Sequence, residues 1–119
     1  SPMSWRSSAK PRRSKVTLQI KDKESKLEER FCREVLKHGG VPRKYVSPGQ
    51  AGVPDRMVYW PRGVTTYAEV KRDEDEKPSK LQEEEIALLQ DMGHLAMLVR
   101  SELDIALFIK RSLDRVRAA

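Results

Sequence analysis

The stretch RMVYWPRGVTTYAEVK, residues 56–71, predicts a β-hairpin, and it constrains the fold more than any other segment. Two strand-like runs flank the PRG sequence, which is typical of a three-residue turn with glycine in the left-handed position. With this turn, Asp55 and Glu69 face each other across the two strands. Their Cβ atoms are then roughly 4.5–5.5 Å apart. Because residues two apart share a face of a strand, Lys71 stands beside Glu69. The hairpin therefore brings two carboxylates and one ammonium group together.

This charged group is suited to phosphodiester hydrolysis. Two carboxylates that lie so close repel each other unless a cation stands between them. Carboxylate oxygens are natural ligands for Mg²⁺, which keeps several waters and also binds phosphate. A divalent ion can activate a bound water, and a lysine ammonium can stabilise the charge that develops on the phosphate. The alternative is a small β-element whose charges are simply solvated, and the hairpin alone leaves both interpretations open.

The rest of the chain adds helices and two further strands. Gly39-Gly40 ends the first helix, and Gly93 ends the second. Three- and four-residue spacing of apolar side chains indicates the helices, and short apolar runs indicate the strands. The order α-β-β-β-α-β-α predicts an α/β fold. Its expected elements outside the hairpin are a helix over about 22–38, a short strand-like edge and a proline- and glycine-rich loop over 41–54, a helix from Ser79, a strand over 94–99 and a helix from Glu102 to about Val116.

Charge divides the 119-residue chain into two parts. Residues 1–26 hold eight basic and two acidic side chains, and the other 93 residues hold 16 of each, so the net charge of +6 lies in the N-terminal segment. We interpret 1–21 as a flexible basic arm, with Ser1-Pro2 as a cloning scar, and 22–119 as one domain. Such an arm attracts polyanions. A solvated tail without a partner is the alternative.

Some classes of protein are disfavoured by composition. One cysteine, Cys32, leaves no internal disulfide framework. No apolar run approaches the roughly 20 residues of a membrane span, and no signal-peptide pattern opens the chain. We therefore expect a cytoplasmic protein with no membrane partner.

Two helical residues each have two interpretations. Glu28 borders the apolar face of the first helix, where a carboxylate needs a partner such as a metal. It also completes the capping pattern SKLE, which begins at Ser25. Gln82 lies on the inner stripe of the second helix, and it too completes a capping pattern, SKLQ, which begins at Ser79. Both pairs of interpretations stay open.

The ordered set of Glu28, SPGQAGVPDR, AEVK and SKLQ resembles the VRR nuclease domain of the PD-(D/E)XK restriction-endonuclease-like superfamily. The match runs from about Glu24 to Lys110, and the small size is similar to that of the stand-alone phage-type members. The resemblance thus implies a location in the bacterial or phage-infected host cytoplasm. The resemblance implies a mixed central sheet flanked by helices. It also implies a DNA endonuclease that depends on Mg²⁺ or Mn²⁺.

The resemblance also assigns roles to individual residues. Asp55 and Glu69 would ligate the metal, with the backbone carbonyl of Val70 as a further ligand. Lys71 would orient or activate the attacking water. Two other residues would support this centre: Glu28 would reach the metal directly or through water, and Gln82 would support the lysine or the water.

The expected partners are DNA and a second copy of the chain. Small members of the family are similar to enzymes that resolve four-way (Holliday) junctions as homodimers, so branched DNA is the expected substrate. A non-catalytic nucleic-acid-binding domain and a structural protein are the competing hypotheses. The main expected DNA contacts lie in or beside the loop before Asp55, at Lys44, Ser47, Gly49, Gln50 and Arg56. Secondary candidates are Arg43, Arg72, which follows the AEVK strand, and Lys80.

Overall fold

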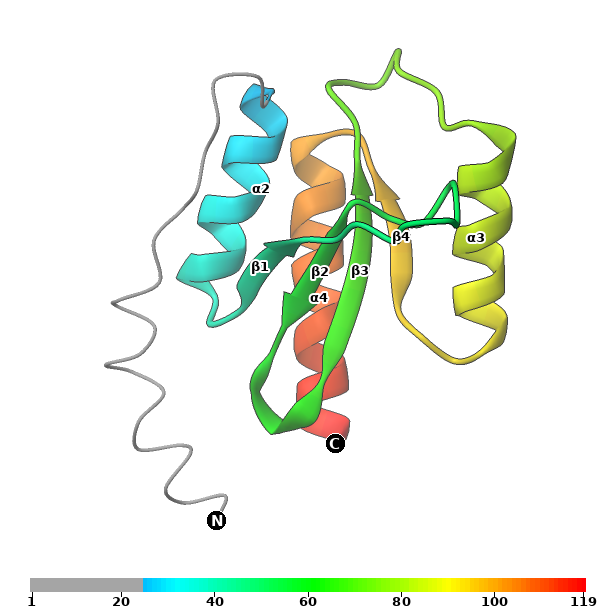
Figure 1. Ribbon diagram of the computed structural model, residues 1–119. Helices are drawn as coiled ribbons and strands as arrows, with labels where there is room; N and C mark the ends of the chain where they lie inside the picture. The colour runs from blue at the N-terminus through cyan, green and yellow to red at the C-terminus, as the bar shows by residue number, and fades with distance from the viewer. Residues whose placement is uncertain (1–24) are drawn as a thin grey trace.

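A computed structural model describes residues 25–119, which form a four-stranded sheet flanked by helices (Figure 1). The predicted arm over 1–21 lies outside the described residues. The predicted order α-β-β-β-α-β-α is confirmed, with one added turn of 3₁₀ helix, η1, in the hairpin. The elements are α2 (Lys26–Lys37), β1 (Val41–Lys44), β2 (Arg56–Tyr59), η1 (Pro61–Gly63), β3 (Thr65–Val70), α3 (Lys80–Asp91), β4 (Ala96–Val99) and α4 (Glu102–Ala118).

The sheet is mixed, as expected, with strand order β1-β2-β3-β4. β2 pairs antiparallel with both β1 and β3, and β4 joins β3 in parallel. Met57 pairs with Tyr67 and Tyr59 with Thr65, so the predicted hairpin register is confirmed. The turn needs two left-handed residues rather than the glycine alone, because Arg62 has φ 65° and Gly63 has φ 76°. Arg62 was not predicted to adopt this conformation.

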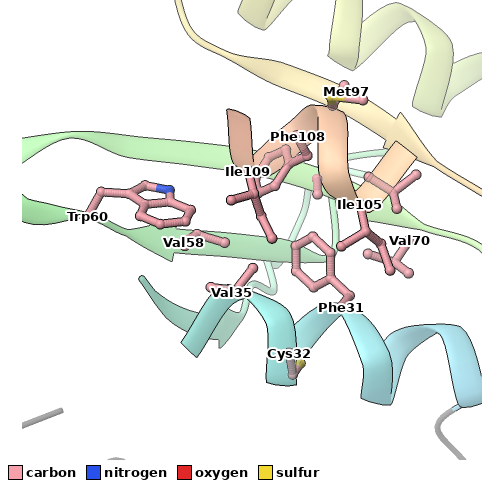
Figure 2. Close-up of a cluster of buried hydrophobic side chains, with 12 residues drawn as sticks. Phe31, Cys32, Val35, Val58, Trp60, Val70, Met97, Ile105, Phe108 and Ile109 are labelled. Atoms are coloured by element: carbon pink, nitrogen blue, oxygen red, sulfur yellow. The ribbon is translucent and has the colours of Figure 1, made fainter. Parts of the chain in front are cut away.

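The hydrophobic core lies between one face of the sheet and helices α2 and α4 (Figure 2). The rings of Phe31 in α2 and Phe108 in α4 pack with their centroids 5.3 Å apart. Val58 and Val70 meet them from the sheet because alternate strand residues point to this side. The core therefore fixes which face of each strand is turned away from α2 and α4.

The helix ends follow the expected signals. The Ser25 hydroxyl accepts a hydrogen bond from the backbone N–H of Glu28 and starts α2. Gly39, with φ 94°, follows the last turn of that helix. The part of this helix predicted over 22–24 lies outside the described residues. Within residues 25–119, every helix is too short or too polar to cross a membrane.

Candidate active site

Asp55 and Glu69 lie side by side at the end of the hairpin that is remote from the turn. The backbone N–H of Asp55 donates to Glu69 Oε1 at 3.2 Å, and the backbone N–H of Val70 donates to Asp55 Oδ1 at 3.1 Å. Each strand thus holds the carboxylate of the other. This is the opposition that the register of β2 and β3 predicts.

Burial makes the negative charges of this pair costly. The pKa of Asp55 is raised to about 7, mainly because burial desolvates the carboxylate and secondly because the negative charge of Glu69 lies nearby. Desolvation also raises the pKa of Glu69, against the opposing effect of Lys71. Added positive charge between the two carboxylates would favour the ionised form of both. The pair is therefore a site that favours a cation.

Lys71 and Gln82 complete a hydrogen-bonded triangle with Glu69. Lys71 Nζ lies 3.4 Å from Glu69 Oε2 and donates to Gln82 Oε1 at 2.8 Å. Gln82 Nε2 donates to the same Glu69 oxygen at 3.2 Å. Lys71 is 7% exposed, so its ammonium is fixed by these contacts rather than by water. The amide of Gln82 holds the lysine and the carboxylate at a set separation.

Gln82 also caps α3. Its Oε1 accepts the backbone N–H of Ser79 at 2.8 Å, while the Ser79 hydroxyl accepts the backbone N–H of Gln82 at 3.1 Å. The capping box is complete. Both interpretations of Gln82 therefore hold at once, because one amide oxygen accepts from two donors.

Glu28 approaches the site from α2 through an ion pair. Its Oε2 lies 3.2 Å from Arg56 Nη2, and the two side chains are 17% and 6% exposed. The charge of Glu28 adds to the raised pKa of Asp55, and that of Arg56 opposes it. Arg56 was predicted as a DNA contact, but the structure buries it beside the carboxylates. The missed signal is strand alternation, which points Arg56 to the same side of β2 as the core residue Val58.

The other expected DNA-binding residues are more accessible. Ser47 is partly exposed. Gly49 and Gln50 lie with it in the loop between β1 and β2, and Arg72 follows β3 beside the partner carboxylate of Glu76, 3.7 Å away. The exposed members of the set are Arg43, Lys44, Gly49, Gln50, Arg72 and Lys80.

The donor atoms at Asp55 and Glu69 fit a hard divalent cation. Within residues 25–119, no three histidine, cysteine, aspartate or glutamate side chains converge as a ligand group. Glu28, with its carboxylate on Arg56, does not form such a triad with the pair. Mg²⁺ needs only one or two carboxylates because it keeps several waters. One buried and one partly buried carboxylate, the latter with a strongly raised pKa, therefore suit it.

Comparisons with known proteins agree with this geometry. No family model matches the chain. A protein of Acyrthosiphon pisum secondary endosymbiont phage 1, named "Putative nuclease p44", is 40% identical over 80 residues, which are 67% of this chain and 85% of that protein. A solved structure titled "VRR_NUC domain" is 31% identical and superimposes with a TM-score of 0.64, covering 73% of this chain and 97% of the other. The resemblance predicted from the four motifs is confirmed, and the chain belongs to the VRR_NUC family of nuclease domains.

Proposed function

We propose that the protein is a divalent-metal-dependent DNA endonuclease that acts on branched DNA, such as four-way junctions. The observation that carries the proposal is the hydrogen-bonded cluster of Asp55, Glu69, Lys71 and Gln82, in which Glu69 and Lys71 are buried. Solvated surface charges do not explain these contacts, because Glu69 and Lys71 are buried and Asp55 is partly buried. Buried charges are costly unless they are paired or bind a metal, and ionisable groups with shifted pKa values gather at functional sites. The junction preference rests on family resemblance alone.

Asp55 and Glu69 would hold Mg²⁺ or Mn²⁺, with the carbonyl of Val70 as a further ligand. When bound, such an ion supplies positive charge at the phosphate and acidifies a bound water. Lys71 Nζ, held 2.8 Å from Gln82 Oε1, points a fixed ammonium group at the same centre. It would orient the attacking water and stabilise the charge that develops on the phosphate. Because the Glu28 carboxylate binds Arg56, Glu28 would act on the metal through water.

DNA would approach along the loop between β1 and β2. Gly49 in this loop has φ 84° and open space around it. The backbone amides there are therefore accessible to a phosphate. Gln50 and Lys44 are exposed on either side of this position. Arg43, Arg72 and Lys80 would add further charge contacts. Arg56 is left out of this set because it is buried.

Cleavage of labelled branched and linear DNA with Mg²⁺ or Mn²⁺ tests the proposal. Lys71→Ala should lower the rate at least about 100-fold, as loss of one transition-state donor does. Asp55→Ala should do the same, and the exposed Lys110→Ala is the matched control. Wild-type cutting by Lys71→Ala would refute the mechanism. Binding of DNA that ignores both Mg²⁺ and Asp55, without cutting, would instead identify a non-catalytic binding domain.

We also propose that the protein is a homodimer, so that each of two sites cuts one strand of a junction. The chain leaves several large apolar side chains at its surface, among them Val46, Met92 and Leu103. Light scattering at micromolar concentration should give twice the chain mass. A monomer mass would contradict the proposal.

A further inference from the structure

The sheet has a second face, turned away from α2 and α4. The strand register places Arg43, Met57 and Tyr67 in one row across this face, and Tyr59 lies in the next row. In the part of the chain that the structure describes, α3 is the helix on this side, since Gln82 reaches Glu69 and Lys71 there. α3 packs against the edge strand β4 and leaves β1 and β2 open (Figure 1).

Aromatic rings gather on this open face. The Tyr67 ring lies 6.3 Å from that of Tyr45 and 5.8 Å, edge-on, from that of His94. The guanidinium carbon of Arg43 lies 5.7 Å from the ring centre of Tyr59, which is 46% exposed. We call these five residues, Arg43, Tyr45, Tyr59, Tyr67 and His94, the tyrosine face.

The tyrosine face continues directly into the candidate active site. The backbone N–H of Tyr45 donates to the carbonyl of Asp55 at 2.8 Å. This bond extends the pairing of β1 and β2 to the row that holds Asp55 and Glu69, which we call the catalytic row. Tyr67 precedes Glu69 by two residues, so their Cα atoms are about 7 Å apart on the same face of β3. Tyr59 lies one row further, about 13 Å from the catalytic row. A strand whose phosphate lies at Glu69 would pass over these rings.

We propose that the tyrosine face binds unpaired bases of the DNA strand that is cut at the adjacent site. Aromatic side chains on an open sheet stack with any exposed base, and a nearby arginine adds a cation–π contact and attracts phosphate. Bases inside a duplex are already stacked on each other and do not reach the rings. This inference rests on the proposed nuclease function and, among branched DNA substrates, favours those with single-stranded nucleotides next to the cut over fully paired junctions.

Charge favours DNA over a second copy of the chain as the occupant. The tyrosine face carries one guanidinium group and two further exposed polar rings, and it carries no carboxylate. Such a surface complements a polyanion. Two copies of the same face would bring together only groups of neutral or positive charge.

Binding of a fluorescent thymidine oligonucleotide of about ten nucleotides, a typical single-strand site size, tests this proposal. Anisotropy is measured in EDTA, with Tyr59→Leu compared with Tyr59→Phe. Leucine keeps apolar area but lacks the flat ring that stacks on a base. The affinity of Tyr59→Leu for the oligonucleotide should therefore fall about tenfold, while that of Tyr59→Phe should stay within about twofold of the wild type. Affinity for a blunt duplex of the same length should be unchanged in both variants. Tyr67→Leu and Tyr67→Phe repeat the comparison at the row nearest Glu69.

Three outcomes would overturn the proposal. One is equal oligonucleotide affinity of the leucine and phenylalanine variants at both positions. Another is a parallel loss of duplex affinity, since that indicates general charge attraction. The third is dissociation of a dimer by Tyr59→Leu with oligonucleotide affinity unchanged, which assigns the face to a second copy. The binding assay uses neither metal nor cleavage, so it still tests the tyrosine face if the protein proves not to be a nuclease. Likewise, the cleavage assay still tests the nuclease proposal if the tyrosine face does not bind bases.

Discussion

Among single residues, Asp55 has the environment that most affects stability. Its pKa of about 7 in the folded protein, against an ordinary value of 3.8, means that the folded state holds this proton more tightly than the unfolded chain. The contribution of this bound proton to the free energy of unfolding is therefore fully present below about pH 4 and is lost as the pH rises through 7. We expect the metal-free protein to be roughly 2 kcal/mol more stable at pH 5 than at pH 8. Urea unfolding in EDTA measures the difference.

Asp55→Asn is the matched control for this pH effect. The amide oxygen of asparagine can still accept the N–H of Val70, but the group no longer titrates. The variant should lose most of the pH dependence and exceed the wild type in stability at pH 8. A pH dependence that survives the substitution would mean that Asp55 does not bind the proton in question.

The positions of the candidate site residues were predictable where they depend on local geometry. Strand alternation and the length of one turn place Asp55, Glu69 and Lys71 beside one another, and both can be read within 17 residues of sequence. The ion pair of Glu28 with Arg56 could not be read in this way. It joins residues 28 positions apart, and it depends on where α2 packs against β2.

At the scale of elements, the first turn of α3 combines helix capping with support of the site. Ser79→Ala removes the acceptor for the Gln82 backbone N–H, which should cost about 1 kcal/mol of stability. The Gln82 side chain can still bridge Lys71 and Glu69, so single-turnover cleavage should stay within several-fold of the wild type. Gln82→Ala removes both functions, and we expect it to lower stability and cleavage together. Equal cleavage losses in the two variants would show that the cap alone matters.

The loop between β1 and β2 depends on a close approach at Gly52. Its φ is 88°, and a Cβ there would meet the backbone carbonyl of Leu81 at 2.7 Å. Gly49, in the same loop, has φ 84° and open space. Gly49→Ala should therefore cost only the left-handed strain, about 1 kcal/mol, whereas Gly52→Ala should cost clearly more. Urea midpoints compare the two, and equal losses would mean that the loop moves away from α3 without cost.

Element types were predictable because each carries a strong local signal. Serines start α2 and α3, glycines end them, and period-two alternation marks β2 and β3. The left-handed Arg62 was missed because nothing in the PRG sequence requires a second left-handed residue beside Gly63. The burial of Arg56 was missed because its neighbour Asp55 suggested an accessible loop end.

At the scale of the whole molecule, the fold class followed from element order, and the mixed sheet followed from family resemblance. Neither indicated which part of the sheet would stay uncovered. That depends on α3, in which no residue is fully buried and which, among the strands, packs mainly against β4. The tyrosine face is therefore a property of helix placement, and this placement arises from long-range packing that periodicity does not encode.

The charge distribution of the whole chain predicts how salt acts on DNA binding. Residues 1–21 hold six basic and no acidic side chains, whereas basic and acidic residues balance beyond residue 26. Each phosphate neutralised contributes about 0.9 to the slope of log affinity against log salt. Deleting 1–21 should therefore make the slope shallower by up to about 5, the value for six contacts. Fluorescence anisotropy of duplex binding across a salt series, in EDTA, measures both slopes.

A chain of residues 1–119 with glutamine at those six basic positions separates the effect of charge from that of length. It should match the deletion, because counterion release depends on neutralised phosphates and not on the presence of a chain segment. An unchanged slope in both variants would show that the arm does not touch DNA, and the residual slope would then belong to the folded domain. Since the charges of that domain balance overall, attraction there must come from local groups such as Arg43 of the tyrosine face and the adjacent exposed Lys44. Arg43→Gln in the deletion background should then reduce the remaining slope by about 1.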